Sequence, residues 1–183
     1  MVVRQAHHHP EPAVDEQRAR QGMDIALKDL QKKVRLNFPQ ILTVTRAILR
    51  HEKIDAATLS IVFVNHQRIR ALNKQYLKRN HVTDVLAFDL SDNVPSKRMP
   101  KTLTGDIIIS TDAALKNVNT FRTTLSQELA LYITHGILHL LGYGDHKPAD
   151  IVKMRLKEQG ILSYLGKRID TIARLKRTRK MKS

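Results

Sequence analysis

Two histidines, His135 and His139, interrupt a stretch that is otherwise almost entirely apolar. Residues four apart on a helix share one face, so a helix here would present both imidazoles side by side. A third histidine, His146, follows Gly142 and Gly144, which allow the chain to turn back toward that face. Three imidazoles and an open fourth position are typical of a catalytic zinc site, whose bound water the metal acidifies. We therefore predict that the three histidines bind one Zn²⁺ ion, and that the resulting hydroxide attacks a phosphodiester or an acyl carbon.

The same stretch argues against two other kinds of zinc protein. A metalloprotease carries Glu directly after its first histidine, as in His-Glu-x-x-His, whereas this sequence has Gly136 there. A structural zinc site usually fills all four positions with protein ligands, often cysteines, and this chain has no cysteine. The residues thus favour an open, hydrolytic site. Nickel, cobalt and iron also accept imidazole, so zinc is favoured over other divalent metals without excluding them.

The histidines lie within a predicted buried helix. Thr124 and Gln127 fit a capping box at its start, and Gly142 suits its end. Apolar periodicity predicts the other elements. Strands are expected at residues 24–30, 59–64, 85–90 and 106–110, helices from residue 39, at 66–77 and at 111–118, and an exposed loop at 91–105. This alternation predicts an α/β (α+β) fold: a single compact domain with a small mixed sheet, helices packed on it, and the metal site at the end of a buried helix.

The charge balance favours an anionic partner. The chain has 32 Lys and Arg against 17 Asp and Glu, a net charge of +15, which attracts phosphate backbones. Arg70, Lys74 and Lys78 recur every four residues and so form one basic face of the predicted helix at 66–77. We predict that this face binds RNA phosphates, which position a strand without reading its sequence. Aromatic residues make up 4% of the chain, so extensive base stacking is not expected.

The chain is predicted to consist of one domain with an extension at each end. Residues 1–22 are polar and aperiodic and are expected to form a flexible N-terminal extension, residues 23–166 the metal-dependent domain, and residues 167–183 a basic C-terminal tail. The longest apolar run, residues 129–133, is far too short to span a membrane, and the first twenty residues contain no apolar signal segment. A cytoplasmic location and no membrane partner are therefore expected.

Three blocks of the sequence resemble the YbeY family of metal-dependent, single-strand-specific endoribonucleases of rRNA maturation. The first, His-Gly-Ile-Leu-His-Leu-Leu-Gly-Tyr at residues 135–143, is similar to the family signature His-Gly-x-Leu-His-Leu-x-Gly-Tyr-Asp-His. The second combines Leu-Asn-Lys-Gln-Tyr at 72–76 with Thr-Asp-Val-Leu-Ala-Phe at 83–88, and the third is Gly-Asp-Ile-Ile-Ile-Ser at 105–110. The blocks occur in the family's order, and the resemblance covers residues 23 to about 165.

The resemblance implies roles for individual residues and also has departures. His135 and His139 match two metal ligands of the family. The family's third histidine falls at Asp145, because Gly144 is an additional residue, so either His146 or Asp145 is expected as the third ligand.

A family arginine that follows the second block's tyrosine is Leu77 here, and Arg79 is the tentative catalytic substitute. Asp84 and Glu128 are candidates for hydrogen-bonding a ligating histidine or for structural roles, a turn cap in the case of Asp84.

The resemblance implies a function in trimming small-subunit rRNA and in ribosome quality control, with single-stranded RNA and the ribosome as partners. Two alternatives remain open on the sequence. One is a non-catalytic, zinc-containing RNA-binding factor of ribosome assembly that retains the fold, which the missing arginine favours. The other is a metal-dependent hydrolase with a substrate other than RNA, which the high positive charge argues against for neutral or cationic substrates.

Overall fold

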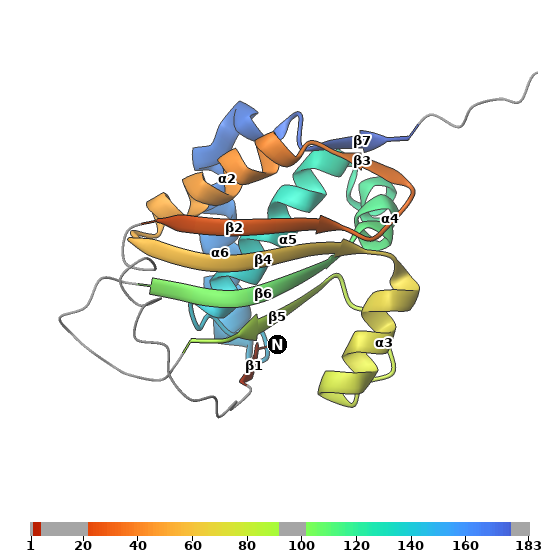
Figure 1. Cartoon of the computed structure of the whole chain (residues 1–183), viewed down its shortest axis with the longest axis horizontal. Coiled ribbons are helices and arrows are strands. Elements are labelled where there is room, and N and C mark those ends of the chain that lie inside the picture. Colours follow the sequence, from red (N-terminus) through yellow and green to blue (C-terminus); the bar gives the residue numbers. More distant parts are fainter. Residues whose placement is uncertain (1, 5–21, 92–101, 177–183) are drawn as a thin grey trace, which may run out of the picture.

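A computed structural model of the chain describes residues 2–4, 22–91 and 102–176 (Figure 1). Its centre is a five-stranded sheet in the order β1-β5-β6-β4-β2. The strands are β1 (Val2–Arg4), β2 (Met23–Asp29), β4 (Ala56–Val64), β5 (Val85–Asp89) and β6 (Thr102–Ser110). Neighbouring strands are parallel except β5 and β6, which are antiparallel, so the sheet is mixed as the sequence predicts.

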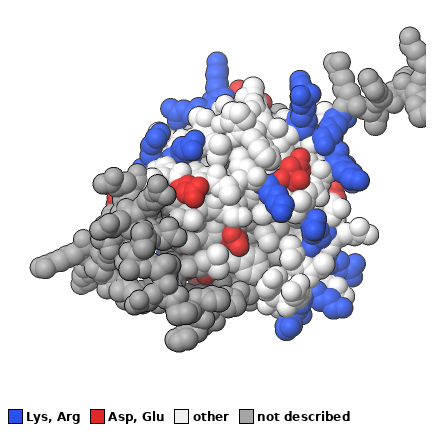
Figure 2. Space-filling view, viewed as in Figure 1, with Lys and Arg blue, Asp and Glu red and all other residues white. Residues whose placement is uncertain are grey.

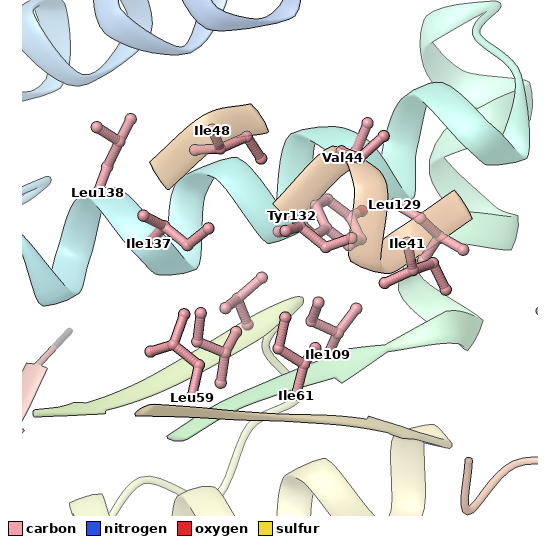
Figure 3. Packing of buried hydrophobic residues seen from close by; sticks show 14 of the residues in the cluster. Ile41, Val44, Ile48, Leu59, Ile61, Ile109, Leu129, Tyr132, Ile137 and Leu138 are labelled. Carbon is pink, nitrogen blue, oxygen red and sulfur yellow. The ribbon is translucent and has the colours of Figure 1, made fainter. Parts of the chain in front are cut away.

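Helices cover the two faces of this sheet unequally. The helices are α2 (Phe38–His51), α3 (His66–Leu77), α4 (Thr111–Phe121), α5 (Leu125–Leu140) and α6 (Pro148–Leu165), followed by a short 3-10 helix, η1 (Gly166–Ile169). The main core lies between one face of the sheet and α2, α5 and α6 (Figure 3). Helix α3 packs on the opposite face through a second, smaller cluster. The domain is therefore an α+β fold with α5 at its centre, as predicted.

Two glycines bring α5 unusually close to the sheet. A Cβ atom on Gly136 would lie 2.5 Å from Cγ2 of Ile107 on β6. A Cβ atom on Gly105 would lie 2.6 Å from the carbonyl oxygen of Phe88 and 2.8 Å from Leu140 of α5. All of these contacts are shorter than a real Cβ atom allows. The backbones can approach only because glycine has a hydrogen atom in place of a side chain. The close packing fixes α5 against β6 beside both histidines.

Two segments expected to lack regular structure contain it. Residues 102–105, predicted as loop, begin β6, while residues 92–101 of that loop lie outside the described residues. Strand β1 lies within the predicted N-terminal extension and pairs with β5 at the sheet edge. Residues 5–21, including the three consecutive histidines, lie outside the described residues. Sequence patterning missed these strands because β1 is only three residues long and residues 102–105 directly follow a stretch containing Pro95 and Pro100 that reads as a loop.

The start of the predicted basic tail is also ordered. Strand β7 (Ala173–Leu175) pairs antiparallel with β3 (Val34–Leu36) to form a separate two-stranded ribbon. Ile169, the last residue of η1, and Ile172, just before β7, are buried in the main core. These two apolar side chains hold residues 167–176 against the domain, so only residues from 177 onward retain the prediction of a tail. Within the described residues, no helix is both long and apolar enough to cross a membrane.

Candidate metal centre

Helix α5 carries both histidines of the central motif, and its start is fixed by a reciprocal cap. The Thr124 hydroxyl oxygen accepts the backbone N–H of Gln127 at 3.2 Å, and Gln127 Oε1 accepts the backbone N–H of Thr124 at 2.7 Å. This is the capping box that the sequence predicts. Beyond the cap, nearly every residue of α5 is buried, including His139, whose side chain is 3% exposed. A buried helix therefore places two imidazoles in its C-terminal half.

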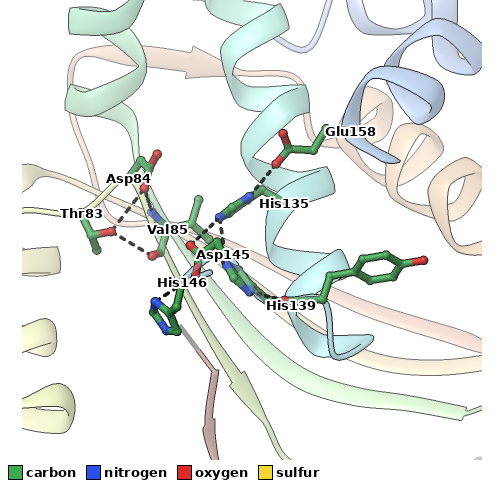
Figure 4. A network of polar contacts seen from close by, with 9 residues as sticks. Thr83, Asp84, Val85, His135, His139, Asp145, His146 and Glu158 are labelled. Carbon is green, nitrogen blue, oxygen red and sulfur yellow. Dashed lines mark hydrogen bonds and ion pairs between the residues drawn. The ribbon is translucent and has the colours of Figure 1, made fainter. Parts of the chain in front are cut away.

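The two imidazole rings face each other through their Nε2 atoms, which lie 2.9 Å apart (Figure 4). The other ring nitrogen of each is already engaged. His135 Nδ1 lies 2.6 Å from Glu158 Oε1, and His139 Nδ1 lies 2.9 Å from the Tyr143 carbonyl oxygen. A carboxylate and a carbonyl accept hydrogen bonds, so each Nδ1 carries the ring proton and each Nε2 presents a lone pair. Two lone pairs at this distance repel each other unless a cation lies between them.

Asp145 adds a third donor to this pair. The chain leaves α5 through Gly142, whose φ of 91° is accessible to glycine without strain. The turn brings Asp145 Oδ2 to 3.5 Å from His139 Nε2 and 3.9 Å from His135 Nε2. One ligand atom from each of the three residues lies within 4.8 Å of the others. Two imidazole nitrogens and one carboxylate oxygen form a donor set that zinc accepts, so these residues fit a single divalent cation.

His146 lies beside this group and not within it. Its side chain is 62% exposed, and its Nδ1 is 3.5 Å from Asp145 Oδ1 (Figure 4). The structure thus places Asp145, the alternative third ligand, where the sequence prediction preferred His146. The additional Gly144 accounts for the difference, because it shifts the histidine one residue further along the chain and leaves the aspartate at the tenth position after His135.

The carboxylate of Glu158 hydrogen-bonds His135, a contact that the sequence did not indicate. Glu158 comes from α6, and its side chain is 13% exposed where it contacts His135. Such a contact fixes the orientation and tautomer of an imidazole ligand. Asp84 instead accepts the backbone N–H of the next residue at 3.0 Å, in a turn, and Glu128 accepts the hydroxyl of Thr123 at 2.5 Å. Neither of these two contacts involves the histidines of the metal group.

Burial keeps His139 in the form that binds metal. Removal from water lowers the pKa of His139 from 6.5 to about 4. The ring is therefore neutral near pH 7. Since a metal displaces protons from its ligands, a ligand that is already neutral binds without that competition.

The basic residues predicted to bind RNA lie on α3 and directly after it. Arg70, Lys74 and Lys78 are exposed, and Figure 2 shows basic side chains gathered over this helix. Arg70 Nε donates to Asn80 Oδ1 at 3.0 Å, which ties the helix to the segment that follows. Arg79 is exposed as well, and the described residues show no ion pair between its side chain and the metal group. The structure does not bring Arg79 to the histidines.

The segment that follows α3 connects this basic face to the metal group. It ends at Asp84, at the start of β5, and β5 packs against α5. Figure 4 shows Asp84 on the same side of α5 as His135. The chain between α3 and β5 therefore joins the basic helix to a strand that packs against α5.

Comparisons with known proteins agree with this arrangement. The chain is 36% identical over 148 residues to Endoribonuclease YbeY of Syntrophus aciditrophicus, an alignment covering 80% of this chain and 92% of that protein. It is 37% identical over 133 residues to Endoribonuclease YbeY of Staphylococcus carnosus, covering 70% of this chain and 86% of that protein.

A solved structure and a family model extend the comparison. The solution structure of TM1509 from Thermotoga maritima has a similar fold, with a TM-score of 0.51 and 18% identity over 87% of this chain and 99% of that one. The family model described as Endoribonuclease YbeY matches residues 23–166, which include β2 to α6 and the whole donor group. The chain belongs to the Endoribonuclease YbeY family.

Proposed function

We propose that this protein is a metal-dependent endoribonuclease that cleaves single-stranded RNA during the maturation of small-subunit rRNA. The observation that carries the proposal is the pair of imidazoles whose Nε2 atoms face each other at 2.9 Å beside Asp145. Both curated relatives described above are named endoribonucleases, so a non-catalytic assembly factor is not favoured. The basic face of α3 supports an anionic substrate.

The residues of the chain have separable parts in this reaction. A divalent ion held by His135, His139 and Asp145 would supply an acidified water and polarise the scissile phosphate. Glu158 and the Tyr143 carbonyl hold the two imidazoles in the tautomer that presents Nε2. The basic side chains of α3 bind the RNA backbone and lead it along the segment that ends at Asp84. Lys78 and Arg79 lie at the start of that segment and would contact further phosphates of the same strand.

Three finer points belong to the proposal. Zinc is the metal we propose, because two imidazoles and one carboxylate in a partly open site suit its coordination. The ribosome or its small subunit is the partner that would deliver the RNA, since phosphate contacts by themselves do not select a sequence. The proposed compartment is the cytoplasm. The proposed division of the chain is an N-terminal extension, a catalytic domain at residues 23–166 with the ordered residues 167–176 packed against it, and a basic tail from residue 177 onward.

The test of the proposal is a cleavage assay with matched RNAs. We expect the purified protein to cut a labelled single-stranded RNA, to leave the same RNA intact when it is annealed to its complement, and to lose activity on dialysis against a chelator. Added Zn²⁺ should restore cleavage. Absence of cleavage by protein that contains stoichiometric metal would overturn the proposed function. Cleavage that persists after the metal is removed would refute the metal-dependent mechanism.

The identity of the third ligand gives a separate prediction. We expect Asp145→Asn to weaken metal binding by about 10-fold or more, because it removes the carboxylate that faces the Nε2 atoms of both imidazoles. His146→Asn, one residue away and largely exposed, should change the affinity less than about threefold. The measurement is competition with a chromogenic zinc chelator, and each variant is the control for the other. The reverse ranking would assign the ligand to His146.

A further inference from the structure

The two-stranded ribbon β3–β7 concentrates positive charge on one of its faces. Arg35 lies directly opposite Arg174, and the ladder continues to Lys33 and Lys176 through the hydrogen bond from Lys176 N–H to the Lys33 carbonyl oxygen at 3.1 Å. Side chains two apart on a strand, or directly opposite each other, point to the same face. These four residues therefore share one face, which we call the basic ribbon.

The pairing at the centre of the basic ribbon is unfavourable without an anion. Like charges directly opposite each other in an antiparallel pair destabilise it. Asp112 forms an ion pair with Lys33 at 2.9 Å. In the described parts of the chain, no ion pair neutralises Arg35, Arg174 or Lys176, and all three are exposed. The opposed arginines are thus available to bind an anionic ligand.

Two hollows meet at the opposed arginines. A cavity of about 630 Å³ is lined by both of them together with Asn37 and Asp170, and a second of about 770 Å³ is lined by both arginines with Leu175 and Lys176. One pair of guanidinium groups therefore borders two adjacent depressions. Each guanidinium can bind one phosphate through a bidentate fork, so two arginines beside adjacent depressions suit a polyanion with successive phosphates.

The basic ribbon lies at the opposite end of α5 from the metal group. The Ser126 hydroxyl, in the first turn of α5, donates to the carbonyl oxygen of Asp170 and accepts the backbone N–H of Ala173, each contact being 3.1 or 3.2 Å long. His139 is 13 residues further along the helix, a distance of about 20 Å at 1.5 Å per residue. The ribbon is therefore separate from the metal site yet within the length of a short RNA strand.

Asp112 also connects the basic ribbon to the basic face of α3. Its two carboxylate oxygens bind Lys33 at 2.9 Å and the backbone N–H of His66, the first residue of α3, at 3.0 Å. Figure 2 shows basic side chains both where β3 and β7 lie and where α3 lies, on the same side of the molecule. The two basic surfaces thus border each other.

We propose that the basic ribbon is a second RNA-binding surface, which binds phosphates of the substrate strand about 20 Å from the metal group. The inference rests on the proposed function, because it assigns a further contact to the same RNA. Arg35 and Arg174 are the central contacts, and Lys176 extends them. Binding at this distance lengthens the footprint of the enzyme without touching the bond that is cut.

The test compares two double variants that remove the same charge. Arg35→Gln with Arg174→Gln alters the ribbon, whereas Arg50→Gln with Arg155→Gln removes two exposed arginines from α2 and α6. The probe is a fluorescein-labelled 20-nucleotide oligouridylate, bound by the full chain with EDTA present to keep the RNA intact. Loss of two phosphate contacts should weaken binding about 10-fold near physiological salt and reduce the slope of log affinity against log salt by about 1.4. The control should change both much less.

Several outcomes would overturn this inference. Equal losses of RNA affinity in the two double variants would show that the ribbon contributes only through the net charge of the protein. Unchanged RNA affinity with lost binding to phosphatidylserine-containing vesicles would assign the ribbon to a membrane surface. Failure of the proposed function is distinguishable, because it would leave the wild-type protein unable to cleave RNA whatever the ribbon variants do. Thermal unfolding of both variants checks that the ribbon still folds.

Discussion

His139→Ala is expected to remove the metal and to lower the rate of RNA cleavage by at least about 100-fold. Mutating a residue that only hydrogen-bonds a metal ligand typically costs about 10–100-fold, and losing the ligand itself should cost more. The side chain is buried at the centre of the donor group, where its Nε2 faces both His135 and Asp145. The measurements are metal content per chain and the initial rate of cleavage of a labelled single-stranded RNA. Glu158→Gln, which keeps the ligands but weakens the hold on His135, should fall between this variant and the wild type.

The control for this prediction is His51→Ala. His51 lies on α2, where its ring packs 4.7 Å from that of Tyr164 and contacts no member of the donor group. This variant should retain full metal content and cleavage. If His139→Ala cleaves RNA as fast as His51→Ala does, the α5 histidines do not belong to the active site.

The metal-free protein should lose roughly 3 kcal/mol of stability between pH 7.5 and pH 4 through His139 alone. The folded protein lowers the pKa of this histidine to about 4, from 6.5, mainly by burial. Between pH 6.5 and pH 4, His139 is protonated in the unfolded chain but stays neutral in the folded protein. The contribution of His139 to the free energy of unfolding is therefore fully present above pH 6.5 and is lost as the pH falls toward 4. Urea unfolding of the metal-free protein at a series of pH values measures this loss.

A non-titrating variant isolates this contribution. His139→Gln should be less stable at neutral pH but should show a shallower loss between pH 7.5 and pH 4. The carboxylates of Glu52 and Asp112, whose pKa values are lowered despite burial, weaken both proteins alike at the acid end. Parallel curves for the wild type and the variant would show that His139 is not the titrating group.

The central helix could be predicted because its signals are local in sequence. The capping box at Thr124 and Gln127 and the near-continuous apolar run define α5 without reference to the rest of the chain. The four-residue spacing of His135 and His139 places their rings together on any helix. The third ligand could not be fixed in this way, because the conformation of a glycine-containing turn decides whether Asp145 or His146 faces the helix.

Helix α6 and the contact it makes were not predictable from periodicity. Its apolar residues fall on several sides, with Val152 and Leu156 exposed whereas Met154 and Ile161 are buried. No single apolar face marks the segment as a helix, so nothing indicated that Glu158 would reach His135. The ribbon was missed for a similar reason. Strands of three residues with an arginine at the centre resemble a solvated tail, and only the burial of Val34, Ile169 and Ile172 shows that they are anchored.

The donor group and its main support come from one short stretch of the chain, with His135 and Glu158 only 23 positions apart. Closing a loop of this length costs less conformational entropy than closing a longer one, although the cost grows only slowly with length. The sheet contributes no ligand, so the stretch can gather an ion while the strands are still unpaired. A ligand that also binds the unfolded chain stabilises the native state by less than its native affinity implies. Metal capture in this protein is therefore coupled to the local order of α5 and α6 more than to formation of the whole domain.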